Sequence, residues 1–149
     1  MRIWVDADAC PGEIKELLYR AAKRTRTKMT LIANQALRTP RSEFIDSIMV
    51  PSGMNVADRR IVELAEPGDL VITADIPLAA EVVAKGAQAL DPRGELYTEA
   101  NVGERLAVRN LSDELRGGGQ ITEGPSNFTA KDRQAFANQL DRWLTAVKE

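Results

Sequence analysis

The start of the chain constrains the fold most, because a short apolar segment there ends in two aspartates. Residues 3–5 are predicted to form a buried strand, and Asp6 and Asp8 follow it with one residue between them. Pro11 is expected to open a helix, since its ring fixes φ and its missing N–H costs nothing in the first turn. A strand, two acids and a helix in this order place the carboxylates at the carboxyl end of a sheet, where open α/β sheets hold ligands.

The rest of the chain alternates short apolar strands with amphipathic helices. Strands are predicted over residues 29–33, 44–50, 70–74 and 87–90. Helices are predicted over residues 13–24, 55–65 and 101–115, between Pro77 and Gly86, and after the capping sequence Thr129-x-x-Asp132. This alternation predicts an α/β fold with a parallel sheet and helices on both of its faces.

The length and composition predict one domain and restrict its chemistry. The single domain is expected over residues 1–149, with a core of about residues 1–94 and a C-terminal helical part over 95–149. The chain has no histidine and one cysteine, which excludes Ser-His-Asp and Cys-His catalysis, an intramolecular disulfide and multi-cysteine metal sites. Any catalysis must therefore depend on carboxylates, lysine, arginine, tyrosine, hydroxyl groups or a bound metal.

The sequence predicts a cytoplasmic protein with no membrane partner. No long apolar run follows Met1, and no segment approaches the roughly 20 apolar residues of a membrane-spanning helix. The net charge of −2 gives no overall attraction to nucleic acid, but basic residues gather locally. The basic end of the first helix, from Arg20 to Lys28, is explained either by the helix dipole or by contact with a polyanion.

Four aspartates are candidates for a shared site. Asp6 and Asp8 follow the first strand, Asp75 follows the fourth, and Asp58 lies in the first turn of the second helix. If the first and fourth strands are neighbours, the acids after them meet at one crevice, and the second helix can bring Asp58 to it. Two unit charges about 4 Å apart repel by about 4 kcal/mol at an effective dielectric of about 20, so such a cluster requires protons or a cation. Oxygen ligands without histidine or cysteine suit Mg²⁺ or Mn²⁺, which act on phosphate oxygens.

Structural roles are also open for these acids. Asp8 can interact with the dipole of the first helix, and Asp75 can cap the third helix. Asp58 can belong to an Asn55-x-x-Asp58 sequence that resembles a capping box. The strand end at Asp6 is the position that a capping role explains least well.

Other polar positions have two interpretations each. Asn34, at the end of the second strand, is either a site residue or part of an Asx-turn. Cys10 is expected to fill space near a helix start rather than to act as a nucleophile, and Asp91 is expected to belong to a turn. Residues 116–120, rich in glycine, are either a flexible loop or a functional lid.

Three segments of the chain have a distinctive sequence: residues 3–11 (IWVDADACP), 71–79 (VITADIPLA) and 124–133 (GPSNFTAKDR). Together they resemble the YaiI/YqxD family of uncharacterised bacterial proteins. This family is similar to PIN-like (PilT N-terminus) domains, which are metal-dependent ribonucleases or flap-type nucleases on a parallel sheet with strand order 3-2-1-4-5. The resemblance therefore implies that fold, with a C-terminal helical extension, and that activity.

The resemblance also implies roles for the acids. Asp6, Asp58 and Asp75 correspond to metal ligands, and Asp8 is an additional catalytic acid. Many PIN domains carry a further acid shortly after the one that ends the fourth strand, whereas residues 76–80 contain none. Asp8 is a candidate to supply that charge.

Three functions remain open from the sequence. The first is a Mg²⁺- or Mn²⁺-dependent nuclease that contacts its substrate through Asn34, Arg38, Arg41 and Thr73, or through the basic end of the first helix. The second is a haloacid-dehalogenase-type phosphatase with Asp6 as nucleophile and Asp8 as its acid–base partner. The third is a non-catalytic module that binds nucleic acid or a nucleotide. The sequence does not predict the oligomeric state.

Overall fold

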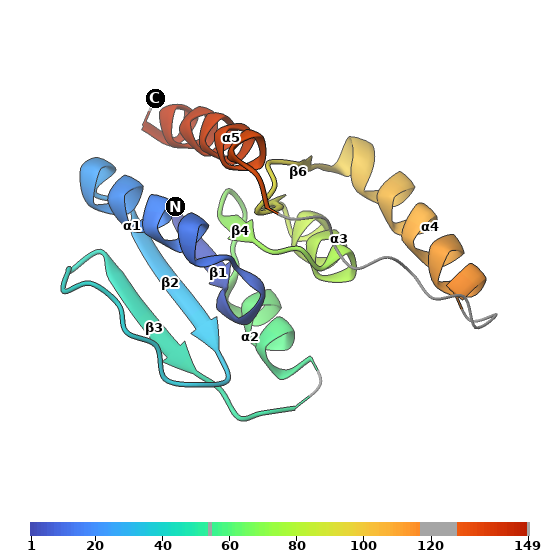
Figure 1. Ribbon diagram of the computed structural model, residues 1–149, viewed down its shortest axis with the longest axis horizontal. Coiled ribbons are helices and arrows are strands. Elements are labelled where there is room, and N and C mark those ends of the chain that lie inside the picture. Colours follow the sequence, from blue (N-terminus) through green and yellow to red (C-terminus); the bar gives the residue numbers. More distant parts are fainter. Residues whose placement is uncertain (54, 117–127, 149) are drawn as a thin grey trace.

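The computed structural model describes residues 1–53, 55–116 and 128–148 and contains one six-stranded sheet (Figure 1). Its strands are β1 (Arg2–Asp6), β2 (Lys28–Ala33), β3 (Ile45–Met49), β4 (Leu70–Ile72), β5 (Gln88–Leu90) and β6 (Leu96–Tyr97). The strand order is β3-β2-β1-β4-β5-β6, and β1 to β5 pair in parallel. The predicted α/β fold and the order 3-2-1-4-5 are confirmed. The antiparallel strand β6 was not predicted, because two residues carry no alternating pattern.

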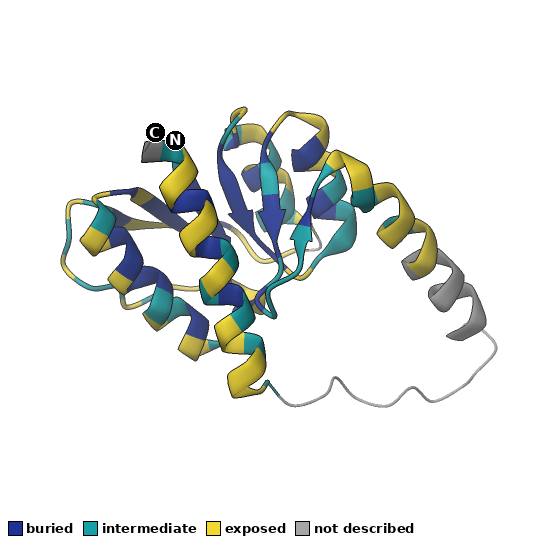
Figure 2. Cartoon of the chain, turned by 90° about the horizontal axis from the view of Figure 1, so that it is seen from above, coloured by how far each residue is buried: buried dark blue, intermediate teal, exposed yellow. Residues whose placement is uncertain are grey.

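Helices cover both faces of the sheet, as predicted. They are α1 (Gly12–Thr25), α2 (Val56–Leu64), α3 (Ile76–Ala84), α4 (Glu99–Arg116) and α5 (Ala130–Lys148), and a short 3₁₀ turn, η1 (Ala7–Ala9), follows β1. One face of the sheet forms a core with α1 and α5, and the other with α2 and α3. Helix α4 packs against α3. The strands between these layers are mostly buried, while the helices are exposed on their outer sides (Figure 2).

Strand β1 shows why the central strands are continuously apolar. Ile3 and Val5 belong to the core under α1 and α5, and Trp4 belongs to the core under α2 and α3. Because both faces of a parallel strand are covered, every position between its ends is buried. In the pairing of β1 with β4, Val5 lies beside Ile72. This register brings the carboxyl ends of β1 and β4 together.

Helix α5 begins as the sequence predicts. The N–H of Asp132 donates to Oγ1 of Thr129 at 3.2 Å, and the N–H of Thr129 donates to Oδ2 of Asp132 at 3.0 Å, which is a reciprocal capping box. Arg93 also pairs with Asp132 at 2.7 Å. Phe136, one turn further along, is fully buried against the sheet, a contribution of about 1.5–3 kcal/mol. The helix is therefore part of the main core.

The predicted capping box of α2 is wrong. Asn55 precedes the helix in the left-handed conformation, with φ of 64°, and its side chain makes no capping hydrogen bond. A capping residue needs an extended backbone to turn its side chain toward the first helical N–H groups, and the left-handed conformation prevents this. The reciprocal cap predicted from Asn55-x-x-Asp58 is therefore not formed at the start of α2.

Two further expectations concern the periphery of the fold. Within the described ranges, none of the helices has the length and apolar character needed to cross a membrane. The predicted loop at residues 116–120 lies outside the described residues, apart from Arg116, which ends α4.

Candidate functional site

A buried hydrogen-bond relay joins the ends of β1 and β4. Asp6, the last residue of β1, is only 7% exposed, and its Oδ2 accepts a hydrogen bond of 3.0 Å from the hydroxyl of Thr73. The same hydroxyl accepts the backbone N–H of Asp75, also at 3.0 Å. Thr73 therefore fixes the position of one candidate acid and the backbone of another. Its link to both is a positioning role, and the substrate contact predicted from the sequence stays a prediction.

Asp75 caps α3 and borders the site at the same time. Its Oδ1 accepts the N–H of Leu78 at 2.9 Å, which is the N-cap interaction that the sequence left open. Capping holds the carboxyl group at the positive end of the helix dipole, where negative charge is stabilised. The structural and the functional interpretations of Asp75 are therefore compatible.

Asp58 reaches Asp75 from the first turn of α2. Its pKa is raised to about 6, first by burial and then by the charges of Asp75 and Asp6. Side-chain hydrogen bonding to Asp75 raises it further, and two carboxyl groups can share such a bond only when one is protonated. The predicted convergence of acids from β1, β4 and the second helix thus takes place at this edge of the sheet.

The electrostatics of Asp6 have the same origin. Burial is the largest cause of its raised pKa, and the nearby charges of Asp75 and Asp8 raise the pKa further. The hydrogen bond from Thr73 acts in the opposite direction and lowers the pKa. Within the described part of the chain, no lysine or arginine forms an ion pair with Asp6, Asp58 or Asp75. A proton or a cation would relieve the resulting repulsion.

Asp8 and Asn34 lie together at the same edge of the sheet. Asp8 is exposed in η1, and its Oδ2 accepts the backbone N–H of Asn34 at 2.9 Å. This bond ties the turn after β1 to the end of β2. Asp8 thereby stays close enough for its charge to raise the pKa of Asp6, while the Asn34 side chain remains exposed.

A pocket of about 370 Å³ opens beside the acids, between α2 and α3. Its lining includes Asn55, Asp58, Arg59, Asp75, Leu78 and Glu81. The sequence interpretation missed both Glu81 and Arg59. Glu81 stands four residues after Pro77, so it shares a face of α3 with the helix start, and its charge also raises the pKa of Asp58. Helical spacing counted from Pro77 was the signal that could have found it.

The predicted basic substrate contacts, Arg38 and Arg41, belong to the loop between β2 and β3, and their role stays a prediction. The loop after β2 returns to the opposite edge before β3 begins, because Ile45 pairs with Met29 at the amino end of the strands. Arg41 lies near that returning end, and no described contact joins it or the exposed Arg38 to the carboxylates.

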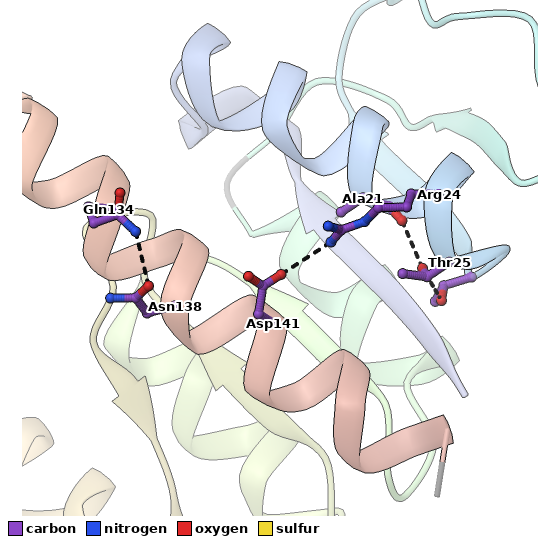
Figure 3. Close-up of polar contacts among 7 residues, drawn as sticks. Ala21, Arg24, Thr25, Gln134, Asn138 and Asp141 are labelled. Atoms are coloured by element: carbon purple, nitrogen blue, oxygen red, sulfur yellow. Dashed lines mark hydrogen bonds and ion pairs between the residues drawn. The ribbon is translucent and has the colours of Figure 1, made fainter.

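The basic end of α1 also lies away from the acids. Lys28 stands beside Arg2 at the amino ends of β2 and β1, whereas the acids follow the carboxyl ends. Arg24 instead pairs with Asp141 of α5 at 3.2 Å (Figure 3).

Cys10 and Asp91 have structural roles. Burial raises the pKa of the Cys10 thiol to about 12, so the thiol stays protonated at neutral pH and is not an activated nucleophile. Asp91 accepts the N–H of Arg93 at 2.7 Å in the turn between β5 and β6. Both observations agree with the roles expected from the sequence.

The carboxylate oxygens of the site suit a hard divalent cation, but they do not converge on a single point where an ion could bind. Carboxylate oxygens are the ligands that Mg²⁺ and Mn²⁺ prefer, and Asp6, Asp58 and Asp75 supply them. Among the described residues, however, no three His, Cys, Asp or Glu side chains are arranged to hold a metal ion together. Asp6 raises the pKa of Asp58 through its charge, whereas Asp75 also contributes hydrogen bonding. Binding of a cation would thus require these side chains to move closer together.

Comparison with known proteins finds relatives along almost the full chain. Residues 4–146 match the family described as "Uncharacterized BCR, YaiI/YqxD family". A UPF0178 protein of Alkalilimnicola ehrlichii is 62% identical over 146 residues, which cover 98% of this chain and 99% of the relative. A UPF0178 protein of Dechloromonas aromatica is 58% identical over 147 residues, covering 99% and 98% of the two chains. No solved structure matches the chain.

Proposed function

The chain belongs to the YaiI/YqxD family, and we propose that it is a divalent-metal-dependent nuclease that hydrolyses phosphodiesters of RNA or DNA. The supporting observation is the approach of the Asp58 carboxyl to Asp75, beside the buried Asp6. Three elements distant in sequence contribute these acids, and no described ion pair neutralises them. A fold that concentrates negative charge in this way is typical of a site that binds a cation.

In this proposal Asp6, Asp58 and Asp75 hold Mg²⁺ or Mn²⁺, which when bound polarises a phosphate and lowers the pKa of an attacking water. The other groups orient these ligands. Thr73 fixes one oxygen of Asp6, and the N–H of Leu78 fixes one oxygen of Asp75. At pH values below its pKa of about 6, Asp58 must lose its proton before it can bind a cation, because carboxylate ligands bind in the deprotonated form. Asp8, exposed at the same edge, adds negative charge beside Asp6.

A second candidate is a non-catalytic module that binds nucleic acid or a nucleotide. It is favoured by the lack, among the described residues, of three side chains arranged to hold a metal ion. Such a module would retain nucleic acid without cleaving it, and its binding would weaken steeply as the salt concentration rises.

Metal-dependent cleavage separates these two functions. Labelled single-stranded RNA, single-stranded DNA and flap substrates are incubated with the protein and Mn²⁺ or Mg²⁺, with chelator as the blank. Cleavage should require the metal and should be lost in Asp6→Asn and Asp75→Asn. The matched control is Asp141→Asn, since Asp141 lies on α5 and pairs with Arg24 far from the site. If the protein binds these nucleic acids but cleaves none of them, the result would support the binding module and overturn the nuclease proposal.

A further inference from the structure

Arg59 lies among acidic side chains in the pocket between α2 and α3. It is exposed on α2 and lines the 370 Å³ pocket together with Asp58, Asp75 and Glu81. Despite these neighbours, it forms no ion pair within the described part of the chain. Its guanidinium is therefore available to a ligand that enters the pocket.

The neighbouring arginine on the same helix behaves differently. Arg60 pairs with Glu63 at 3.2 Å, three residues further along α2, and it does not line the pocket. Helical geometry explains the contrast, because successive residues project about 100° apart around the helix. Two adjacent arginines thus occupy different surroundings: Arg60 is paired on the helix surface, and Arg59, among the described residues, has no ion pair beside the acids.

We infer that Arg59 contacts a phosphate group of the substrate in this pocket, next to the phosphodiester that is hydrolysed at the carboxylates. The inference rests on the proposed nuclease function. A guanidinium presents a planar set of donors that matches two phosphate oxygens, and it stays charged at any physiological pH. Arg59 directly follows Asp58 in α2, and both residues line the pocket. The pocket has the size range of ligand sites in proteins, so it can accept a nucleotide unit that follows the cleaved bond.

The salt dependence of RNA binding tests this contact, because each lost phosphate contact lowers the slope of log K against log salt by a known amount. Single-stranded RNA is titrated with the non-cleaving Asp6→Asn protein at constant Mn²⁺, while KCl is varied between about 50 and 200 mM. Arg59→Ala in this background should weaken binding by about 3- to 10-fold and reduce the slope of log K against log salt by about 0.7. Arg60→Ala is the matched control and should leave the slope unchanged. Alanine favours helix, so both variants keep α2 intact.

Kinetics of the otherwise native protein give a second readout. Arg59→Ala should raise KM several-fold for single-stranded RNA, with kcat affected less, because a flanking phosphate contributes to binding before and during the reaction. Arg59→Lys should recover part of the affinity, since lysine keeps the charge but not the fork of donors.

The outcomes distinguish this inference from the function on which it rests. If the wild-type protein cleaves RNA but Arg59→Ala and Arg60→Ala have the same salt slope and KM, Arg59 does not contact phosphate and the inference is overturned. If the wild-type protein neither binds nor cleaves nucleic acid, the proposed function fails and the role of Arg59 fails with it.

Discussion

The hydroxyl of Thr73 donates a 3.0 Å hydrogen bond to Oδ2 of Asp6, across 67 residues of sequence. The same oxygen accepts the backbone N–H of Asp75, so one buried side chain joins two candidate metal ligands. The pair exists because β1 and β4 are neighbours in the sheet, with Val5 beside Ile72. The positions of the acids therefore follow from the strand order.

Replacing Thr73 by valine should destabilise the protein and disturb the acids. Valine keeps the shape of threonine but leaves the carboxylate of Asp6 and the N–H of Asp75 without this partner, a loss of about 1–3 kcal/mol in the free energy of unfolding. Urea unfolding followed by tryptophan fluorescence measures this, since Trp4 and Trp143 are both buried. Thr73→Ser keeps the hydroxyl and should lose clearly less. Equal losses in the two variants would show that the hydroxyl contributes little.

Asp58 should make the metal-free protein less stable as the pH rises. Its folded pKa of about 6 exceeds the reference value of 3.8, so the folded state binds the proton more tightly than the unfolded state. The free energy of unfolding therefore falls as the pH rises from 3.8 to about 6, and it stays reduced at higher pH. In chelator, Asp58→Asn should raise the free energy of unfolding by about 1 kcal/mol at neutral pH, a figure reduced for solvent screening of a partly exposed group.

The same variant should change little at pH values well below 3.8, where Asp58 is protonated in both the folded and the unfolded state. Denaturant titrations of the wild-type protein and Asp58→Asn across the acidic range measure the difference, with Asp141→Asn as control. A stabilisation that did not depend on pH would mean that the charge of Asp58 is not its cause.

A bound divalent cation should reverse this destabilisation. Mn²⁺ is expected to raise the thermal unfolding midpoint at neutral pH, because a ligand that binds only the folded state stabilises it by mass action. The shift should shrink toward pH 5, where protons compete for Asp58, and should disappear in Asp75→Asn. Asp141→Asn should keep the full shift. An equal shift in Asp75→Asn would place the cation elsewhere on the protein.

Replacing Gly94 by alanine should destabilise the protein, because Gly94 packs against the backbone of α5. A Cβ there would come within 2.6 Å of the backbone of Ala135, and the φ of Gly94 is +97°. Gly94→Ala should therefore push α5 away from the sheet and cost about 2–3 kcal/mol. Gly103→Ala is the matched control, since that glycine lies in α4 with open space around it and alanine favours helix. Thermal unfolding that ranks the two variants in the opposite order would contradict this packing.

The sequence predicts the sheet and part of the site because both follow from the order of the strands. Once β1 and β4 are neighbours, Asp6 and Asp75 must share an edge, whatever the loops do. The position of Asp58 depends instead on how α2 lies across the sheet, and that packing leaves no local pattern. The left-handed backbone of Asn55 is equally hidden, since its sequence also resembles a cap.

The basic residues show a different limit. Arg38 and Arg41 were predicted as substrate contacts, and that role stays a prediction, because the loop that carries them connects the acidic edge to the amino ends of the strands. Arg59 gave no signal in the sequence, because one arginine among several on a helix is ordinary. Its significance comes only from the pocket that it lines.

Anomalous diffraction from crystals soaked in Mn²⁺ tests the central claim most directly, because it locates the ion without relying on activity. We predict a single strong peak within coordinating distance of carboxylate oxygens of Asp6, Asp58 and Asp75, with the three side chains drawn together, and no peak there in Asp75→Asn crystals. A wild-type map without a peak among these acids, at Mn²⁺ concentrations that saturate known sites, would contradict the metal-dependent mechanism and leave nucleic-acid binding without catalysis as the function to pursue.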